Sequence, residues 1–277
     1  MSDFKKVRKN SGFLYSAKSI FSRVLSNKRR RFVFSVLLLS LGILTAEEIL
    51  GKFGLYIVFA LSVFTVLFLY LSLKEDLKGN FTPQTFILPF FYSLSVGLFY
   101  LLVPARLITR IGVTSLYALG LYSLFLSENI FTVSSIRTIA LLSGARTVSL
   151  TLSLLSFFFL SNVVFSFHMN VFITLLLIFL YSFPMVLQSV WVYTLEKNPL
   201  AQFFWVLSLS ICLEEVAIFL WFRAGSPTVL ALFLTAIFYV FIGMSQAWFE
   251  KRLFRSIIFE YFWITVVAFI FLIFFAS

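Results

Sequence analysis

The strongest constraint on this chain is a series of apolar stretches, each about as long as a helix that crosses a bilayer. A spanning helix needs about 20 largely apolar residues, because the hydrocarbon core is about 30 Å thick. The chain contains nine such stretches, and we expect each of them to be a transmembrane helix. They cover residues 32–50, 54–73, 84–103, 107–127, 147–167, 170–192, 203–223, 227–248 and 257–276.

The composition excludes other fold classes. Hydrophobic residues make up 61% of the 277 residues and charged residues only 12%, whereas a soluble domain carries roughly 25% charged residues. No alternating pattern of the kind found in transmembrane barrel strands competes with the long apolar stretches. The sequence therefore predicts an all-α, polytopic transmembrane helix bundle over residues 32–277. Because Arg110 interrupts the stretch 107–127, eight spans is the alternative count.

The distribution of basic residues predicts the orientation. Cytoplasmic loops of membrane proteins carry more Lys and Arg than external loops. With nine spans and a cytoplasmic N-terminus, 18 of the 22 basic residues are cytoplasmic, and the C-terminus is external. The four external ones are Lys52, Arg106, Arg110 and Arg223. We therefore expect a multi-pass protein of the cytoplasmic membrane.

Residues 1–31 form a basic cytoplasmic segment ahead of the first span. They contain ten of the 22 Lys and Arg residues and a single acidic residue, Asp3. Apolar residues within 13–27 recur at helical spacing, which predicts an amphipathic helix in the plane of the interface. A loosely ordered basic tail is the alternative. Because the segment leads directly into an apolar stretch, we expect it to contact anionic lipids rather than nucleic acid.

Two adjacent acidic residues, Glu214 and Glu215, are the main candidate for a functional site. They lie 11 and 12 residues beyond Phe203, which places them about 17 Å into the span and near the middle of the bilayer. An ionisable group at that depth costs roughly 2.5–3.5 kcal/mol on insertion scales, so it requires a partner or a wet cavity. Since neighbours on a helix point about 100° apart, we expect one of the two to face the bundle interior. The pair predicts an intramembrane proton or cation site; a structural carboxyl hydrogen-bonded to Ser, Thr or Tyr is the alternative.

A second group of charges is predicted at the outer interface. It comprises Glu47, Glu48, Lys52, Arg106 and Arg110. The two arginines are four residues apart and therefore share a helix face. Ion pairs that fix helix packing are one interpretation of this outer polar cluster, and a pocket for a polar headgroup or solute is the other.

No catalytic or metal-binding motif accompanies these charges. With one cysteine, Cys212, and one histidine, His168, neither an intrachain disulfide nor a Cys/His metal cluster is predicted. Gly-x-Ser-x-Gly, a Gly-rich phosphate loop and His-Glu-x-x-His are missing. The Glu-Glu-x-x-x-Arg pattern of CAAX-type intramembrane proteases fails at Lys52 and lacks its second histidine. We expect no cofactor, and enzymatic activity stays open without a supporting motif.

Two prolines and one polar segment complicate the pattern of spans. Pro89 and Pro184 lie inside predicted spans and are expected to kink them. Residues 128–146, which begin with Glu128, are longer than a simple connector. They are predicted to form either a cytoplasmic interfacial helix or the lower part of a helix that enters the bilayer at residue 147.

Three short motifs carry a resemblance to a known family. They are the run Leu73–Gly79, the turn Ser127–Phe131 followed by Ile136–Ile139, and Ser226–Val229 at the start of a span. Together they resemble a family of uncharacterised multi-spanning membrane proteins from candidate-phyla (Patescibacteria-type) bacteria. The resemblance implies a bacterial cytoplasmic membrane protein, and it implies no activity and no functional residue.

Two functions from different classes follow from these features. The first is a carrier, or a lipid- or solute-handling protein, with Glu214 or Glu215 as a protonatable site. The second is a non-transporting scaffold or assembly factor that acts through contacts with anionic lipid and with another membrane protein.

Overall fold

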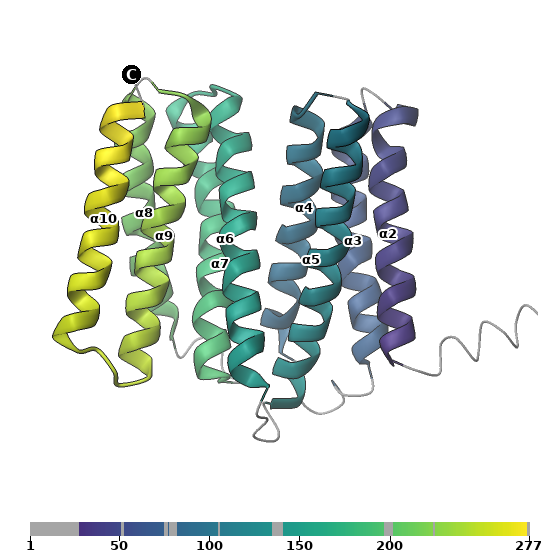
Figure 1. The fold of residues 1–277 in the computed structure, drawn as a ribbon, viewed down its shortest axis with the longest axis horizontal. Coiled ribbons are helices and arrows are strands. Elements are labelled where there is room, and N and C mark those ends of the chain that lie inside the picture. Colours follow the sequence, from purple (N-terminus) through teal and green to yellow (C-terminus); the bar gives the residue numbers. More distant parts are fainter. Residues whose placement is uncertain are drawn as a thin grey trace, which may run out of the picture.

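The computed structural model describes residues 28–50, 53–74, 77, 82–104, 106–134, 141–196, 202–223 and 225–275. Within these ranges the chain forms nine long helices that run antiparallel in one bundle, and it forms no strand (Figure 1). A short 3₁₀ helix, η2 (Pro83–Phe86), directly precedes α4. The long helices are α2 (Lys28–Leu50), α3 (Gly54–Leu73), α4 (Ile87–Leu102), α5 (Leu107–Ser134), α6 (Leu142–Ser166), α7 (Val171–Thr194), α8 (Phe203–Phe222), α9 (Pro227–Phe249) and α10 (Arg255–Phe275).

The helices confirm the predicted polytopic all-α bundle. Among the described residues, the helices from α3 to α10 supply eight segments long and apolar enough to cross a membrane, and α2 lies alongside them over the same height (Figure 1). A helix satisfies its backbone amides and carbonyls within the segment, which is why apolar stretches take this form in lipid. We call the end of the bundle at which α2 begins the Lys28 end. α10 finishes at the opposite end (Figure 1). Residues 1–27, with their predicted amphipathic helix, lie outside the described residues.

α5 differs from its predicted span. It continues past residue 127 to Ser134, and Glu128 is fully buried inside the bundle. Residues 128–134 therefore continue α5 instead of beginning a separate segment, and Gln188 on α7 gives Glu128 a polar partner there. The helix that enters the next predicted span at 147 begins earlier, at Leu142, which confirms the second alternative for residues 142–146.

The two prolines occupy different helical positions. The predicted span 84–103 opens with η2, and α4 begins only at Ile87, so Pro89 lies in the first turn of α4. Amide groups in a first turn have no intrahelical acceptor, so proline is tolerated there without a break. Pro184 does lie inside a helix, and α7 continues through it from Val171 to Thr194.

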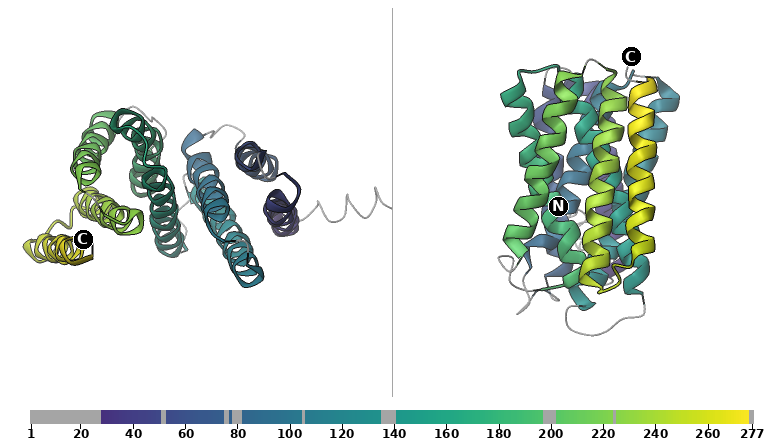
Figure 2. Two further views of the ribbon diagram at one scale, coloured as in Figure 1. Left: turned by 90° about the horizontal axis from the view of Figure 1, so that it is seen from above. Right: turned by 90° about the vertical axis from the view of Figure 1, so that its left-hand side faces the viewer.

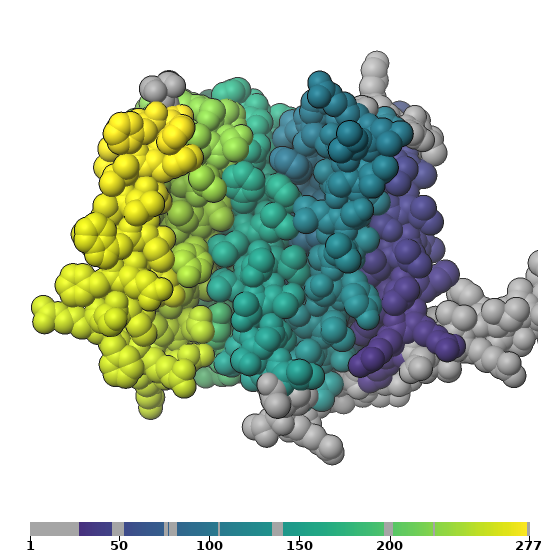
Figure 3. All heavy atoms as spheres, viewed as in Figure 1, coloured from purple at the N-terminus to yellow at the C-terminus, as the bar shows by residue number. Residues whose placement is uncertain are grey.

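α6 lies at the centre of the bundle. It packs against α4 and α5 on one side and against α7 and α9 on the other, so α2–α5 and α6–α9 form two neighbouring four-helix groups with α10 at the edge (Figure 2). Two stacked ring pairs flank α6: Phe99 on Phe159, with centroids 4.2 Å apart, and Phe157 on Phe238, at 4.3 Å. The space between the ribbons of Figure 1 is filled by side chains on this face (Figure 3). Such van der Waals packing is a main driving force for helix association in lipid.

The packing of α4 on α5 depends on a glycine. Tyr92 of α4 lies against Gly120 of α5, and its hydroxyl donates a hydrogen bond to the Leu116 carbonyl oxygen, 2.8 Å away. A Cβ atom at position 120 would overlap with the Tyr92 hydroxyl group. Gly112, on the same helix, has no such neighbour, because no atom lies within 4 Å of its added Cβ.

We therefore expect Gly120→Ala to destabilise the protein by about 1–3 kcal/mol, the usual cost of overpacking a close contact. Gly112→Ala is the matched control and should be neutral or slightly stabilising, since alanine favours helix over glycine. Thermal unfolding of the two purified variants in detergent measures the difference. Equal unfolding temperatures would show that Tyr92 moves aside without cost.

Candidate functional site

The two adjacent acidic residues of α8 have different surroundings. Glu214 is partly buried, whereas Glu215 is exposed on the outer side of α8. The Oε1 atom of Glu214 is itself buried and has no hydrogen-bond partner in the described part of the chain. Of the pair, Glu214 is thus the residue that faces the bundle interior, as expected for neighbours that point about 100° apart.

A pair of buried hydroxyl groups lies beside Glu214. Tyr181 of α7 and Ser161 of α6 are hydrogen-bonded, with 2.7 Å between their oxygen atoms. Glu214 is close enough to Tyr181 to interact with it electrostatically, and the Tyr181 ring packs edge-on against Phe157. The interior of the bundle therefore holds a hydrogen-bonded hydroxyl pair between α6 and α7, in addition to the partly buried carboxyl of α8.

Glu128 of α5 is a second carboxyl that faces the interior of the bundle, and sequence reasoning did not place it there. It is fully buried, and its Oε1 atom accepts a hydrogen bond of 3.0 Å from Nε2 of Gln188 on α7. Its second oxygen and the Gln188 Oε1 atom have no partner among the described residues. Phe131 and Thr132, three and four residues on, share its helix face and are buried as well, which only the structure shows.

Arg146 joins three helices at the Lys28 end. Its guanidinium donates to the main-chain oxygens of Val192, at 3.2 Å, and Tyr193, at 2.9 Å, near the C-terminal end of α7. It also lies 3.5 Å from a carboxylate oxygen of Glu250, just after α9, and 5.3 Å from the Tyr193 ring centroid. The last carbonyl groups of a helix lack intrahelical donors, and a cation there stabilises them. Arg146 therefore fixes the ends of α6, α7 and α9 relative to one another.

The predicted outer polar cluster is only partly placed. Arg106 is exposed just before α5, and Arg110 is partly buried in the first turn of that helix. Glu47 and Glu48 belong to α2, but their side chains and all of Lys52 lie outside the described part. Because α2 packs against α5, the end of α2 and the start of α5 are neighbours opposite the Lys28 end. The cluster itself stays a prediction.

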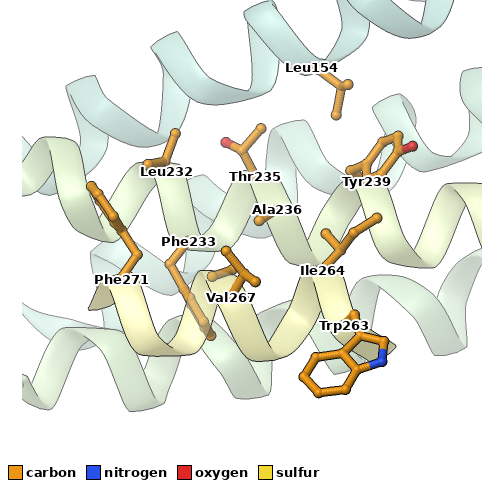
Figure 4. Close-up of a pocket in the computed structure, with 11 residues that line it drawn as sticks. Leu154, Leu232, Phe233, Thr235, Ala236, Tyr239, Trp263, Ile264, Val267 and Phe271 are labelled. Carbon is orange, nitrogen blue, oxygen red and sulfur yellow. The ribbon is translucent and has the colours of Figure 1, made fainter. Parts of the chain in front are cut away.

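A groove of about 590 Å³ lies between α6, α9 and α10 (Figure 4). Its walls are almost wholly apolar, with Phe233 and Leu232 of α9 facing Val267 and Phe271 of α10. The hydroxyl of Thr235, which also lines it, already donates to the Ala231 carbonyl oxygen at 2.7 Å. The groove therefore suits a hydrocarbon chain and offers no charged group to a polar solute.

Comparison with known proteins gives one match. The model of a family described as a protein of unknown function (DUF5656) matches residues 69–275. No curated protein and no solved structure matches the chain. The matched region extends from the last turn of α3 to the end of α10, so it contains Glu128, Glu214 and Glu215.

The Glu128–Gln188 contact predicts a measurable coupling between two helices. Gln188→Leu is expected to lower stability by about 1–3 kcal/mol, because Glu128 stays buried without its donor. The double variant Glu128→Leu/Gln188→Leu should recover part of this loss, since apolar groups then replace both members of the pair. Thermal unfolding in detergent measures both variants. A double variant less stable than Gln188→Leu alone would contradict a pairwise role.

Proposed function

The chain belongs to the DUF5656 family of unknown function, and we propose that it is a carrier in which Glu214 binds a proton, a cation or a donor group of a solute. The family supplies no activity, so the proposal rests on the geometry of the bundle. The observation that carries it is the buried Oε1 atom of Glu214, which has no hydrogen-bond partner among the described residues. A buried acceptor without a donor costs about 1–3 kcal/mol, and a bound donor removes that cost.

The position of Glu214 supports this role. It lies 11 residues from Phe203 and eight from Phe222, so it is about 17 Å and about 12 Å from the two ends of α8. Secondary transporters bind substrate and coupling ions near the middle of the bilayer. Glu214 is partly buried and its Oε1 atom lacks a donor among the described residues, whereas Glu128 is fully buried and already bonded to Gln188.

Buried hydroxyl groups between α6 and α7 extend the proposed site towards the Lys28 end. Ser149 and Ser153 of α6 and Ser189 of α7 line a small crevice together with Arg146, and all three serines are buried. The Ser189 hydroxyl has no hydrogen-bond partner among the described residues. A hydroxyl group both donates and accepts, so it can pass on a proton.

We further propose that the Lys28 end faces the cytoplasm of a bacterial cell. The described residues favour this orientation, because cytoplasmic ends carry the excess of Lys and Arg. Three described basic residues lie opposite the Lys28 end: Arg106, Arg110 and Arg223. Nine lie at or near it, namely Lys28, Arg29, Arg30, Arg31, Lys74, Arg146, Lys251, Arg252 and Arg255. Anionic lipid headgroups of the inner leaflet are the proposed partners of this end.

A scaffold that binds another membrane protein is the second candidate function, and α10 favours it. Of the eight candidate spans, α10 is the least buried, and it packs mainly on α9. Its outer face includes Trp263 and Phe274, both largely exposed. A partner helix would find there a long apolar surface that the rest of the bundle leaves open.

The carrier proposal predicts different results for two neighbouring substitutions. Glu214→Gln should reduce solute-dependent proton entry into proteoliposomes at least about tenfold, the effect of losing about 1.4 kcal/mol of binding. Glu215→Gln makes the same chemical change one residue away, on the exposed side, and should leave the flux intact. Amino acids, sugars and organic cations are added in turn while an entrapped pH-sensitive dye reports proton entry. Flux that survives Glu214→Gln, or no flux with any solute class, would contradict the proposal.

The orientation predicts the behaviour of terminal fusions in a bacterial host. Alkaline phosphatase fused to the C-terminus should be active, because that enzyme folds only outside the cytoplasm and nine crossings place the C-terminus there. Green fluorescent protein fused to the N-terminus should be fluorescent. An inactive C-terminal fusion in protein that reaches the membrane would favour eight crossings instead.

A further inference from the structure

A polar cavity lies at the end of the bundle opposite the Lys28 end, where the α6–α7 and α8–α9 connections meet. Its volume is about 370 Å³, within the range of roughly 300–1,000 Å³ that small-molecule sites occupy. His168, between α6 and α7, and Arg223, directly after α8, line it. Thr174 in the first turn of α7 adds a hydroxyl group, and Phe165 and Leu230 form part of an apolar wall.

The charge of this cavity is positive. Arg223 is partly buried, and its Nε atom is buried without a hydrogen-bond partner among the described residues. No acidic residue is found in the lining, so no carboxylate neutralises the guanidinium inside the cavity. A guanidinium presents its N–H donors in a planar fork that matches a phosphate group. An anion in the cavity would give the buried Nε–H of Arg223 the acceptor that it lacks among the described residues.

Hydrogen bonds between helices hold the walls of the cavity in place. The indole N–H of Trp221 donates to the Met169 main-chain oxygen at 3.2 Å, which ties the end of α8 to the α6–α7 connection. Nearby, the Asn162 side-chain amide of α6 donates to the Thr228 hydroxyl of α9 at 3.1 Å. Tryptophan is enriched at the level of lipid headgroups, so Trp221 indicates that the cavity opens at that level.

We propose that this cavity binds a phosphate-bearing anion, supplied either by an anionic phospholipid headgroup or by free phosphate. Arg223 pairs with the phosphate oxygens and His168 supplies a further hydrogen-bond donor, whereas the Thr174 hydroxyl already donates to the Met169 main-chain oxygen at 3.4 Å. The apolar wall at Phe165 and Leu230 accommodates the part of a lipid that follows its headgroup. This site is separate from the carboxyl at Glu214, which lies further inside the bundle on α8, and it does not depend on the carrier proposal.

The test uses the full-length protein in neutral detergent and phosphate-free buffer. Short-chain phosphatidylglycerol and sodium phosphate are titrated in turn, and calorimetry measures each dissociation constant. We expect phosphatidylglycerol to bind, and Arg223→Gln to weaken binding about tenfold or more, the loss expected for hydrogen bonds to a charged group. Arg255→Gln, which removes an exposed arginine at the Lys28 end, is the control and should leave the affinity unchanged.

The two probes distinguish the source of the anion. Binding of phosphatidylglycerol alone identifies a lipid headgroup site, and binding of sodium phosphate as well identifies a site open to soluble phosphate. If Arg223→Gln fails to fold, Arg223→Lys and His168→Gln take its place and should each weaken binding. Affinity that is unchanged in these variants, or wild-type protein that binds neither probe, overturns the proposal. Glu214→Gln should leave this binding intact, so failure of the carrier proposal is recognised separately.

Discussion

Hydrocarbon offers no hydrogen-bond partners, and this constraint governs the polar groups of the bundle as well as its backbone. Helices satisfy the backbone within each segment, so the polar side chains that remain must find partners on neighbouring helices. Tyr92 reaches the Leu116 carbonyl oxygen of α5, and Gln188 of α7 reaches Glu128 of α5. Polar contacts of this kind, added to the aromatic stacks around α6, fix which helices become neighbours.

The candidate sites are the places where a buried polar atom has no hydrogen-bond partner in the described part of a neighbouring helix. Glu214 Oε1 and Arg223 Nε are both buried without a partner among the described residues. Both belong to α8 or the residue that follows it, and both face the α6–α9 group rather than the α2–α5 group. A negative group inside the span and a positive group at its end place two complementary binding chemistries in the same half of the bundle. Their ligands differ in charge, so the two proposals stand independently.

Several side-chain contacts join the two four-helix groups, α2–α5 and α6–α9. α6 packs on both groups, and the Phe99–Phe159 stack and the Glu128–Gln188 pair cross from α4 and α5 to α6 and α7. Alternating access requires one group to move against the other. Such a movement would have to break the Phe99–Phe159 stack and the Glu128–Gln188 hydrogen bond, or shift the residues on both sides together. Arg146 acts within the second group instead, because it binds the ends of α7 and α9.

The sequence by itself determined the all-α class and the approximate positions of the long helices, because the length of an apolar stretch is a local property. It also determined that Glu214 and Glu215 lie near the middle of α8, since that position follows from distance along one helix. Only the tertiary structure decided that Glu214 faces inward and that Glu128 is buried against Gln188. It alone brought His168 and Arg223 to one cavity. All spans are similarly apolar, so no local pattern records which helices pack together, and every site built across helices depends on that choice.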